Sequence, residues 1–356
     1  MPAPGIIYAN SGYKNGQMNK LLTPTQLIIK VAICIAALVI VMFVCSLAGT
    51  QQISLSKVFE GPGQNVDYDI YIGVRIPRII LAALIGAALA ASGAALQAIL
   101  RNPLAEPYIL GISSGAALGV MIAVLAGISA SFLGGSPMAV MAFLFAIGTV
   151  WLVWFIGHLA GGATVTNLLL AGVVINAFFS AVIMLMTSLI DNEKLRSTIM
   201  WLMGTIGEKD FATLSISAIF IIAGIIALFL ISNKLNVLAF GAGEAQSLGV
   251  NPRKITLIAF ALASFITAVA VGLSGLVGFV GLVVPHSVRL VFGPDHRQLL
   301  PASALLGAAF VVICDTIART IIAPAQLPVG VITAIIGGPI FLILLSRYSK
   351  KVGTLR

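Results

Sequence analysis

Three arginines are the residues whose type and position most directly suggest binding chemistry. Arg75 and Arg78 stand close together at the start of an apolar segment, and Arg319 lies near the end of another. A guanidinium group is weakly hydrated and holds a carboxylate with two parallel hydrogen bonds, so each side chain could bind an acidic group. Two other roles fit the same positions: anchoring to lipid headgroups and, for Arg319, an ion pair with Asp315 one helical turn earlier.

The sequence lacks the residue patterns of catalysis and of metal binding. It has 3 histidines, and neither His286 nor His296 has a carboxylate or thiol at ligand spacing, so we predict no metal site. The cysteines, Cys34, Cys45 and Cys314, lie in apolar segments and are expected to be small buried side chains. No phosphate-binding loop of the form G-x-x-x-x-G-K followed by Ser or Thr occurs, and no catalytic constellation appears. We therefore expect a chain that is not an enzyme.

The elements that must position these residues are membrane helices. Hydrophobic residues make up 60% of the chain and charged residues 9%, and the mean hydropathy is +1.11, which is far outside the range of soluble domains. A membrane span needs about 20 apolar residues, and about ten windows meet that need. They are 27–49, 78–99, 108–128, 138–158, 166–190, 212–232, 254–273, 276–292, 301–320 and 329–346. Each should be a helix, because lipid leaves the edge of a sheet unpaired.

The distribution of charge predicts the orientation. If both termini are cytoplasmic and the spans alternate, most of the 20 lysines and arginines fall on the cytoplasmic side, whereas acidic residues slightly outnumber basic ones outside. This asymmetry is the one that membrane insertion produces. The net charge of +9 is thus spread over short loops at one membrane face, which argues against nucleic-acid binding. We predict a multi-pass protein of a bacterial or archaeal cytoplasmic (inner) membrane.

The chain divides into a short arm and one membrane domain. Residues 1–22 are polar and without periodicity, and they predict a poorly ordered cytoplasmic arm. Residues 23–356 form a single transmembrane domain, whose first helix is marked by Thr23 as N-cap and Pro24 in the first turn. Glycines at four-residue intervals, Gly111, Gly115 and Gly119, predict close packing of a second helix.

Two blocks of sequence carry a resemblance to a known family. The first is RIPR at 75–78, followed by a span of small residues and RNPLAEP at 101–107. The second is GLVGFVGLVVPHSVRLVFGPDHRQLLP at 275–301, followed by DTIAR and LPVGVITAIIGGP. In this order they resemble the permease subunits of the FecCD-type (type II) ABC importers for iron-siderophores, haem and vitamin B12. The resemblance covers nearly all of the chain after residue 27.

This resemblance implies a helical bundle like that of the vitamin B12 permease, working as a homodimer. Its implied partners are two ATPase subunits, which bind ATP and Mg²⁺, and one extracytoplasmic substrate-binding protein; the chain itself would hold no cofactor. The commonest cargo in such importers is a ferric siderophore, which we expect here, with cobalamin and haem as alternatives. An ion-coupled secondary transporter is the alternative class, but it needs ionisable groups near mid-membrane, and every acidic residue falls at a span end or in a loop.

The resemblance also implies two contact sites. Arg75, Arg78 and Arg319 match arginines that pair with acidic residues of the binding protein. The loop 241–254 matches the element that contacts the ATPase. Within it, we expect Gly243 to cap a short helix, Glu244 to favour its N-terminus, Ala245 and Leu248 to share one face, and Gly249 to end it. The expected contact residues are Gly241, Gly243, Glu244, Ala245, Leu248 and Gly249.

A gate is the third implied site. The family places small hydroxyl residues at a cytoplasmic constriction that matches 164–166, where this chain departs from the pattern with Val165. Thr166 is either a constriction residue or part of a helix cap. Asn167 and Asn176, like Gln97, are polar residues at or inside spans, where such side chains usually face the bundle or a wet pathway.

Overall fold

The computed structural model describes residues 13–14, 17–18, 23–63, 65–128, 137–162, 164–207 and 210–353. Apart from one small hairpin, the elements in this part of the chain are helices. The hairpin is β1 (Tyr13–Lys14) and β2 (Gln17–Met18), antiparallel, with Tyr13 opposite Met18; the rest of the predicted arm lies outside the described residues. The longer helices are α2 (Pro24–Leu47), α5 (Ile76–Ile99), α6 (Ile112–Leu125), α7 (Pro137–Leu159), α8 (Val165–Thr187), α10 (Phe211–Leu230), α13 (Pro252–Ser274), α14 (Val280–Phe292), α15 (His296–Thr320) and α16 (Val329–Gly353).

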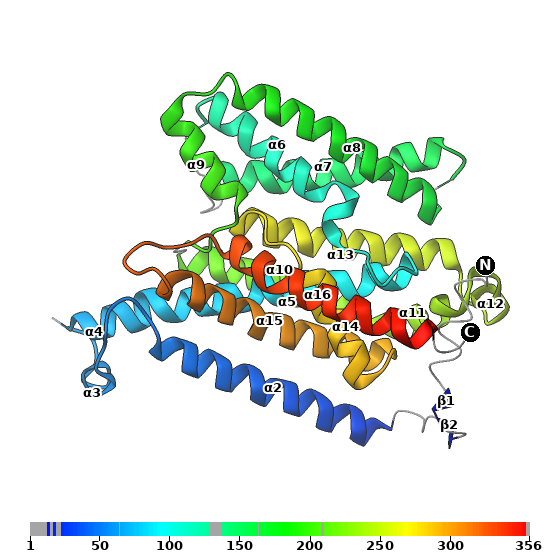
Figure 1. Ribbon diagram of the computed structural model, residues 1–356, viewed down its shortest axis with the longest axis horizontal. Helices are drawn as coiled ribbons and strands as arrows, with labels where there is room; N and C mark the ends of the chain where they lie inside the picture. Colours follow the sequence, from blue (N-terminus) through cyan, green and yellow to red (C-terminus); the bar gives the residue numbers. More distant parts are fainter. Residues whose placement is uncertain are drawn as a thin grey trace.

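Short helices connect these at the two ends of the bundle. They are α3 (Leu55–Val58), α4 (Val66–Tyr68), the π-helix η1 (Asp69–Arg75), the 3-10 helix η2 (Pro107–Leu110), α9 (Asn192–Leu202), α11 (Ser232–Phe240) and α12 (Ala242–Ser247). Figure 1 shows α3, α4 and α9 at one end, and α12 at the other, where α2 begins and α16 ends. By the predicted orientation the first is the outer end and the second the cytoplasmic end.

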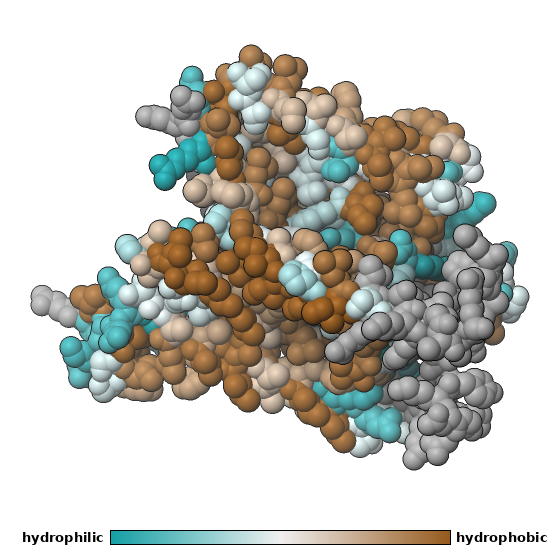
Figure 2. Space-filling model, viewed as in Figure 1, coloured by the Kyte–Doolittle hydropathy of each residue, from teal (hydrophilic) through white to brown (hydrophobic). Residues whose placement is uncertain are grey.

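Each predicted window overlaps one of the longer helices, which confirms the predicted membrane fold. Among the described residues, 7 helices are long and apolar enough to cross a membrane, and the shorter apolar helices are Ile112–Leu125, Val280–Phe292 and Val329–Leu344. The caps predicted at two starts are present: the Thr23 side chain accepts from the backbone N of Gln26, and the Asn251 side chain from that of Lys254. Figure 2 shows a largely apolar side face, as lipid requires.

Several predicted boundaries differ from the helix ends by a few residues, and the starts of α14 and α15 show why. The window 276–292 begins too early, because 275–279 is not helical and contains two residues of positive φ, Gly275 and Phe279. The window 301–320 begins too late: α15 starts at His296 behind Asp295 as N-cap and carries Pro301 inside it.

The core of the bundle is α5, whose side chains are nearly all buried. Small residues allow its neighbours to come close: a Cβ at Gly86 would overlap the carbonyl of Gly307 on α15, and one at Gly93 the carbonyl of Gly281 on α14. The glycine pattern in α6 works in the same way, because Gly115 and Gly119 face backbone carbonyls of α7. Gly111 differs, since it joins η2 to α6 with a φ of 77°.

The longer helices form two groups that meet at α13. Figure 1 shows α6, α7 and α8 together on one side, and α2, α5, α14, α15 and α16 together on the other. Helix α13 packs against α5 of the second group, against α6 and α7 of the first, and against α10. The residues expected to contact partners lie at the ends of these helices rather than inside either group.

Candidate functional site

Arg75 closes the outer end of α2. The last carbonyls of a helix have no partner within it. The Arg75 guanidinium donates to the carbonyls of Ser46 (3.0 Å) and Leu47 (3.1 Å), and also to that of Gln51. Arg319 donates to the neighbouring carbonyl of Cys45 at 3.0 Å. Both arginines are buried, with exposed fractions of 4% and 6%, so α2 is fastened to α5 and α15 at this point.

The Asp315 carboxylate is shared by Arg78 and Arg319. Arg78 donates to both of its carboxylate oxygens, from Nε at 3.2 and 3.1 Å and from Nη2 at 2.9 Å. Arg319 Nε forms an ion pair with the same carboxylate at 3.5 Å. Arg78 also donates to Gln326 Oε1 at 3.1 Å. We name Arg75, Arg78, Asp315 and Arg319 the outer arginine cluster.

The structure brings the predicted docking residues together and turns them inward. The ion pair of Arg319 with Asp315, which the sequence suggested as an alternative, is present. Arg75 and Arg319 are occupied by carbonyls of α2, whereas Arg78 keeps 12% of its side chain exposed. Docking of a binding protein stays a prediction, and in this conformation Arg78 is the most accessible of the three arginines.

At the cytoplasmic end, residues 241–249 form a short exposed helix between two glycines, which we name the coupling segment. Gly241 (φ 149°) precedes α12 and Gly249 (φ 76°) follows it, as predicted for its end. Ala245 is fully buried and holds the helix to the bundle, while Leu248 is 66% exposed. Its role as a contact residue for the ATPase stays a prediction.

One detail of this prediction was wrong. The helix starts at Ala242, so the residue before it is Gly241, and Gly243 lies in the first turn instead of capping it. The shared face of Ala245 and Leu248 stays a prediction; their exposed fractions differ, at 0% and 66%. The Glu244 carboxylate folds back against Gly241, where a side chain would collide with it. Beside the segment lies an open hollow of about 550 Å³, lined by residues 242, 246 and 249–253.

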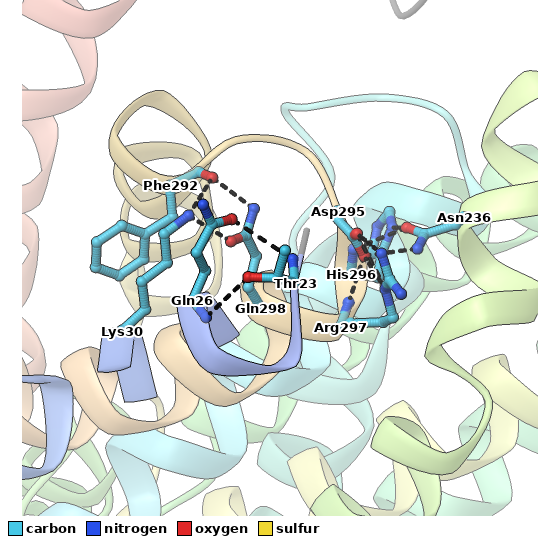
Figure 3. Close-up of polar contacts among 9 residues, drawn as sticks. All are labelled: Thr23, Gln26, Lys30, Asn236, Phe292, Asp295, His296, Arg297 and Gln298. Atoms are coloured by element: carbon cyan, nitrogen blue, oxygen red, sulfur yellow. Dashed lines mark hydrogen bonds and ion pairs between the residues drawn. The ribbon is translucent and has the colours of Figure 1, made fainter. Parts of the chain in front are cut away.

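A second polar cluster holds the turn between α14 and α15 at this end (Figure 3). From α11, Asn236 Oδ1 accepts from the backbone N and from Nδ1 of His296, and its Nδ2 donates to Asp295 Oδ1, each at 2.7 Å. Asp295 also pairs with Arg297 at 2.6 Å. Burial acts to raise the pKa of Asp295, but the hydrogen bonds from Arg297 and Asn236 outweigh it and leave the pKa below its ordinary value.

The other side of this turn is held by α2. Lys30 Nζ donates to Gln298 Oε1 at 2.7 Å and lies 5.6 Å from the centre of the Phe292 ring. We name Lys30, Asn236, Asp295, His296, Arg297 and Gln298 the cytoplasmic polar cluster. Sequence reasoning missed it, although the GPDHRQ sequence of the second block contains most of its members.

The predicted gate residues lie in the first turn of α8 and, for Asn176, near its middle. The Thr164 side chain accepts from the backbone N of Asn167 at 3.3 Å, and the Asn167 amide donates to the carbonyls of Ala160 (3.0 Å) and Gly162 (2.8 Å). Thr164 and Asn167 thus cap the α7–α8 turn. Val165 is half-buried, Thr166 is exposed, and Asn176 is half-buried in an otherwise apolar helix. Their role as a gate stays a prediction.

Gln97, in contrast, faces the bundle. Its amide donates to the carbonyls of Gly281 and Leu282, both at 3.3 Å, and accepts from Arg289 at 3.0 Å. All of its polar atoms therefore have protein partners, so this side chain stabilises the contact of α5 with α14.

The RNPLAEP loop makes a contact that the sequence did not reveal. The Glu106 carboxylate accepts from the backbone N of Phe279 at 2.7 Å, and the Tyr108 hydroxyl accepts from that of Val277 at 2.6 Å. Burial raises the pKa of Glu106 to about 7, against the opposing effect of the Phe279 hydrogen bond. These bonds satisfy two N–H groups of the non-helical segment 275–279, and they join the two sequence blocks that carried the resemblance.

Comparison with known proteins decides the family. A model described as the FecCD transport family matches residues 37–347. The chain belongs to the FecCD transport family. The resemblance carried by the two blocks is thereby confirmed, and the match covers nearly all of the membrane domain.

Members of the FecCD family close to this chain are permeases. The hemin transport system permease of Yersinia pestis is 38% identical over 85% of this chain and 91% of its own length. The cobalamin import system permease of Halobacterium salinarum is 42% identical over 76% and 72%. A solved inward-facing structure of a metal-chelate type ABC transporter is 31% identical, covers 90% of this chain and 99% of its own, and superposes with a TM-score of 0.78. This FecCD chain is thus a multi-pass permease of the ABC importer type.

Proposed function

We propose that this FecCD permease forms the membrane pathway of an ATP-driven importer that brings a metal chelate, with a ferric siderophore as the leading cargo, into the cytoplasm. It would act as a homodimer with two ATPase subunits and an extracytoplasmic binding protein, in a bacterial or archaeal cytoplasmic (inner) membrane. ATP hydrolysis would belong to the separate ATPase subunits, which carry the ATP and Mg²⁺.

The coupling segment is the observation that carries this proposal. It is a short helix between Gly241 and Gly249, with Ala245 anchored in the bundle and Leu248 presented outward. A compact helix transmits a push from a neighbouring subunit better than a floppy linker does. In the proposed cycle, ATP draws the ATPase subunits together, the coupling segments move with them, and the pathway opens outward to receive the chelate.

The class of cargo, a metal chelate, is supported by the names of the relatives. They include permeases for hemin, for cobalamin, for iron chelatin in Helicobacter pylori and for molybdate in Haemophilus influenzae. Iron chelates and metal-centred macrocycles predominate among them, which favours a chelate that is delivered whole. The same range defines the panel of cargoes that a test must contain.

The proposal is tested by uptake into proteoliposomes that contain the permease, its ATPase and its binding protein. Labelled ferric siderophore, haem, cobalamin and molybdate are offered with and without ATP, and with an ionophore that collapses ion gradients. We expect ATP-dependent uptake of the ferric siderophore that resists the ionophore. Uptake that is independent of ATP and is abolished by the ionophore would instead indicate an ion-coupled transporter. Selective uptake of another cargo would overturn the choice of siderophore.

A variant pair tests the coupling segment in the same assay. Leu248→Asp should abolish uptake by weakening the ATPase contact, whereas Leu189→Asp should not, because Leu189 is equally exposed (70% against 66%) but lies at the outer end. Binding of the ATPase to each variant is measured by co-purification. Normal ATPase binding and uptake by Leu248→Asp would contradict the assigned contact.

A further inference from the structure

Helix α11 connects the coupling segment to the bundle on its N-terminal side, while on its C-terminal side the chain continues into α13 at Pro252. Helix α11 ends at Phe240, one residue before Gly241, and is anchored by Leu235 and Leu238, which are 0% and 2% exposed. Helix α11 packs against α5 and α15 as well as against α12. A displacement of the coupling segment must therefore either move α11 or be absorbed at Gly241.

Asn236 gives α11 a directional connection to α15. The first backbone N–H groups of a helix lack partners within it. The backbone N–H of Arg297 donates to the side chain of Asp295, the N-cap of the same helix. The backbone N–H of His296 donates to the side chain of Asn236, which belongs to a different helix. Because Oδ1 receives two donors and Nδ2 gives one hydrogen bond to Asp295, the orientation of the amide is fixed. Figure 3 shows this amide facing the start of α15.

Helix α15 extends from this contact to the opposite membrane face. It begins beside Asn236 and carries Asp315 and Arg319 of the outer arginine cluster in its last turns. Between the two, Gly307 lies against Gly86 of α5, so that the two helices are in close contact at this point. A closely packed helix moves as a unit, because interiors at this density do not deform continuously.

We propose that Asn236 is a positioning residue that links the coupling segment to α15, so that movement driven at the cytoplasmic end is passed to the helix that holds the outer arginine cluster. The inference rests on the proposed function, since it assumes that an ATPase moves the coupling segment. Coupling between distant sites has to be demonstrated functionally and not only by proximity. The chain offers a set of variants for that demonstration.

The variants are Asn236→Ala, Asn236→Asp, Asp295→Asn and the double variant that exchanges the two residues. Asn236→Asp places two carboxylates where a hydrogen bond of 2.7 Å now exists, which is repulsive. In the double variant, the amide on α15 donates to the carboxylate on α11, that carboxylate still accepts from His296, and asparagine remains a good N-cap. Asn233→Ala is the matched control, because Asn233 is an exposed asparagine on the same helix.

The measurement is the number of ATP molecules hydrolysed per substrate taken up by the reconstituted complex, beside the thermal stability of each variant. We expect Asn236→Ala and Asn236→Asp to raise this ratio about two- to thirtyfold, the range in which mutations change coupling between sites. The exchange should bring the ratio back toward that of the unaltered protein, and Asn233→Ala should leave it unchanged.

A purely structural role gives a different result. ATP hydrolysis and uptake would then fall together with the amount of folded complex, the ratio would stay constant, and the inference would be overturned. An unchanged ratio in a variant of normal stability would overturn it as well. If Leu248→Asp still abolishes uptake while Asn236 variants remain coupled, only this inference fails; if neither has an effect, the proposed function fails with it.

Discussion

The two ends of α15 are held by opposite kinds of polar contact. At the outer end, a charged carboxylate that is only 2% exposed is shared between two guanidinium groups. At the cytoplasmic end, a neutral amide makes the connection, and the nearby pair of Arg297 with Asp295 is 38% and 22% exposed. One helix is therefore held by ionic contacts in a dry environment at one end and by partly buried hydrogen bonds beside a partly exposed ion pair at the other.

This difference suggests which end can move. Removing one partner from a buried ion pair leaves an uncompensated charge, so the outer contact is costly to break. Hydrogen bonds next to water can be exchanged for bonds to water, and each contributes a net stability of about 1 kcal/mol. The cytoplasmic end is thus the one where a partner could change the geometry at small cost, while the outer end keeps α2, α5 and α15 together.

The largest effect is expected from Asp315→Asn. This change leaves Arg78 and Arg319 without a counter-charge in a buried setting, and it should lower the free energy of unfolding by about 3–5 kcal/mol. Thermal unfolding of the purified permease in detergent measures the loss. Asp69→Asn, an exposed aspartate at the same end, should change little.

A second variant keeps this test decisive if the single one fails to fold. Arg78→Gln combined with Asp315→Asn removes one guanidinium together with the carboxylate, so the double variant should be more stable than Asp315→Asn alone. Equal stability of Asp315→Asn and the unaltered protein would show that this ion pair does not fix the outer end.

An intermediate effect is expected from the middle of the helix. In Gly307→Ala the new Cβ meets Ala90 and the carbonyl of Gly86, so α15 must move away from α5. Overpacking of this kind costs about 1–3 kcal/mol. The control is Gly148→Ala in α7, where no atom lies within 4 Å and the helix should be unaffected or slightly more stable. Loss of uptake by Gly307→Ala with an unchanged unfolding temperature would argue against a purely structural contact.

Much of this architecture could be predicted from the sequence, because lipid imposes simple requirements on it. Long apolar windows located the membrane helices, and the Thr23 and Asn251 caps followed from local chemistry. The start of α14 could not be predicted, since 275–279 is held in its non-helical form by Glu106 and Tyr108 from a distant part of the chain.

The site contacts also fall into two kinds, those between residues close in sequence, which could be predicted, and those between distant residues, which could not. The pair of Arg319 with Asp315 could be inferred from its i,i+4 spacing. The stronger partner of Asp315 is Arg78, 237 residues earlier in the chain, and no pattern in a single sequence connects the two. Asn236 and Asp295 are 59 residues apart and belong to different motifs. Single-sequence reasoning thus identified residues able to form contacts, and the fold decided which of those contacts are made.

The smallest effect is expected from Asp295→Asn, and it should depend on pH. The folded protein lowers the pKa of Asp295 below its unfolded value, which is about 3.9, so the charged form contributes stability above that pH. This contribution disappears as the pH falls through the folded pKa. Because the ion pair is partly exposed, its contribution should be below about 1 kcal/mol, and asparagine keeps the N-cap.

Unfolding of the two proteins is compared at pH 7 and in acid below the folded pKa of Asp295. The unaltered protein should be slightly more stable at pH 7, and the difference should vanish in acid, where Asp295 is protonated in both states. A loss at pH 7 as large as that of Asp315→Asn would mean that the cytoplasmic end is held as firmly as the outer end. In that case the amide of Asn236 would join two immobile helices, and the adjustable contact would have to be sought at Gly241.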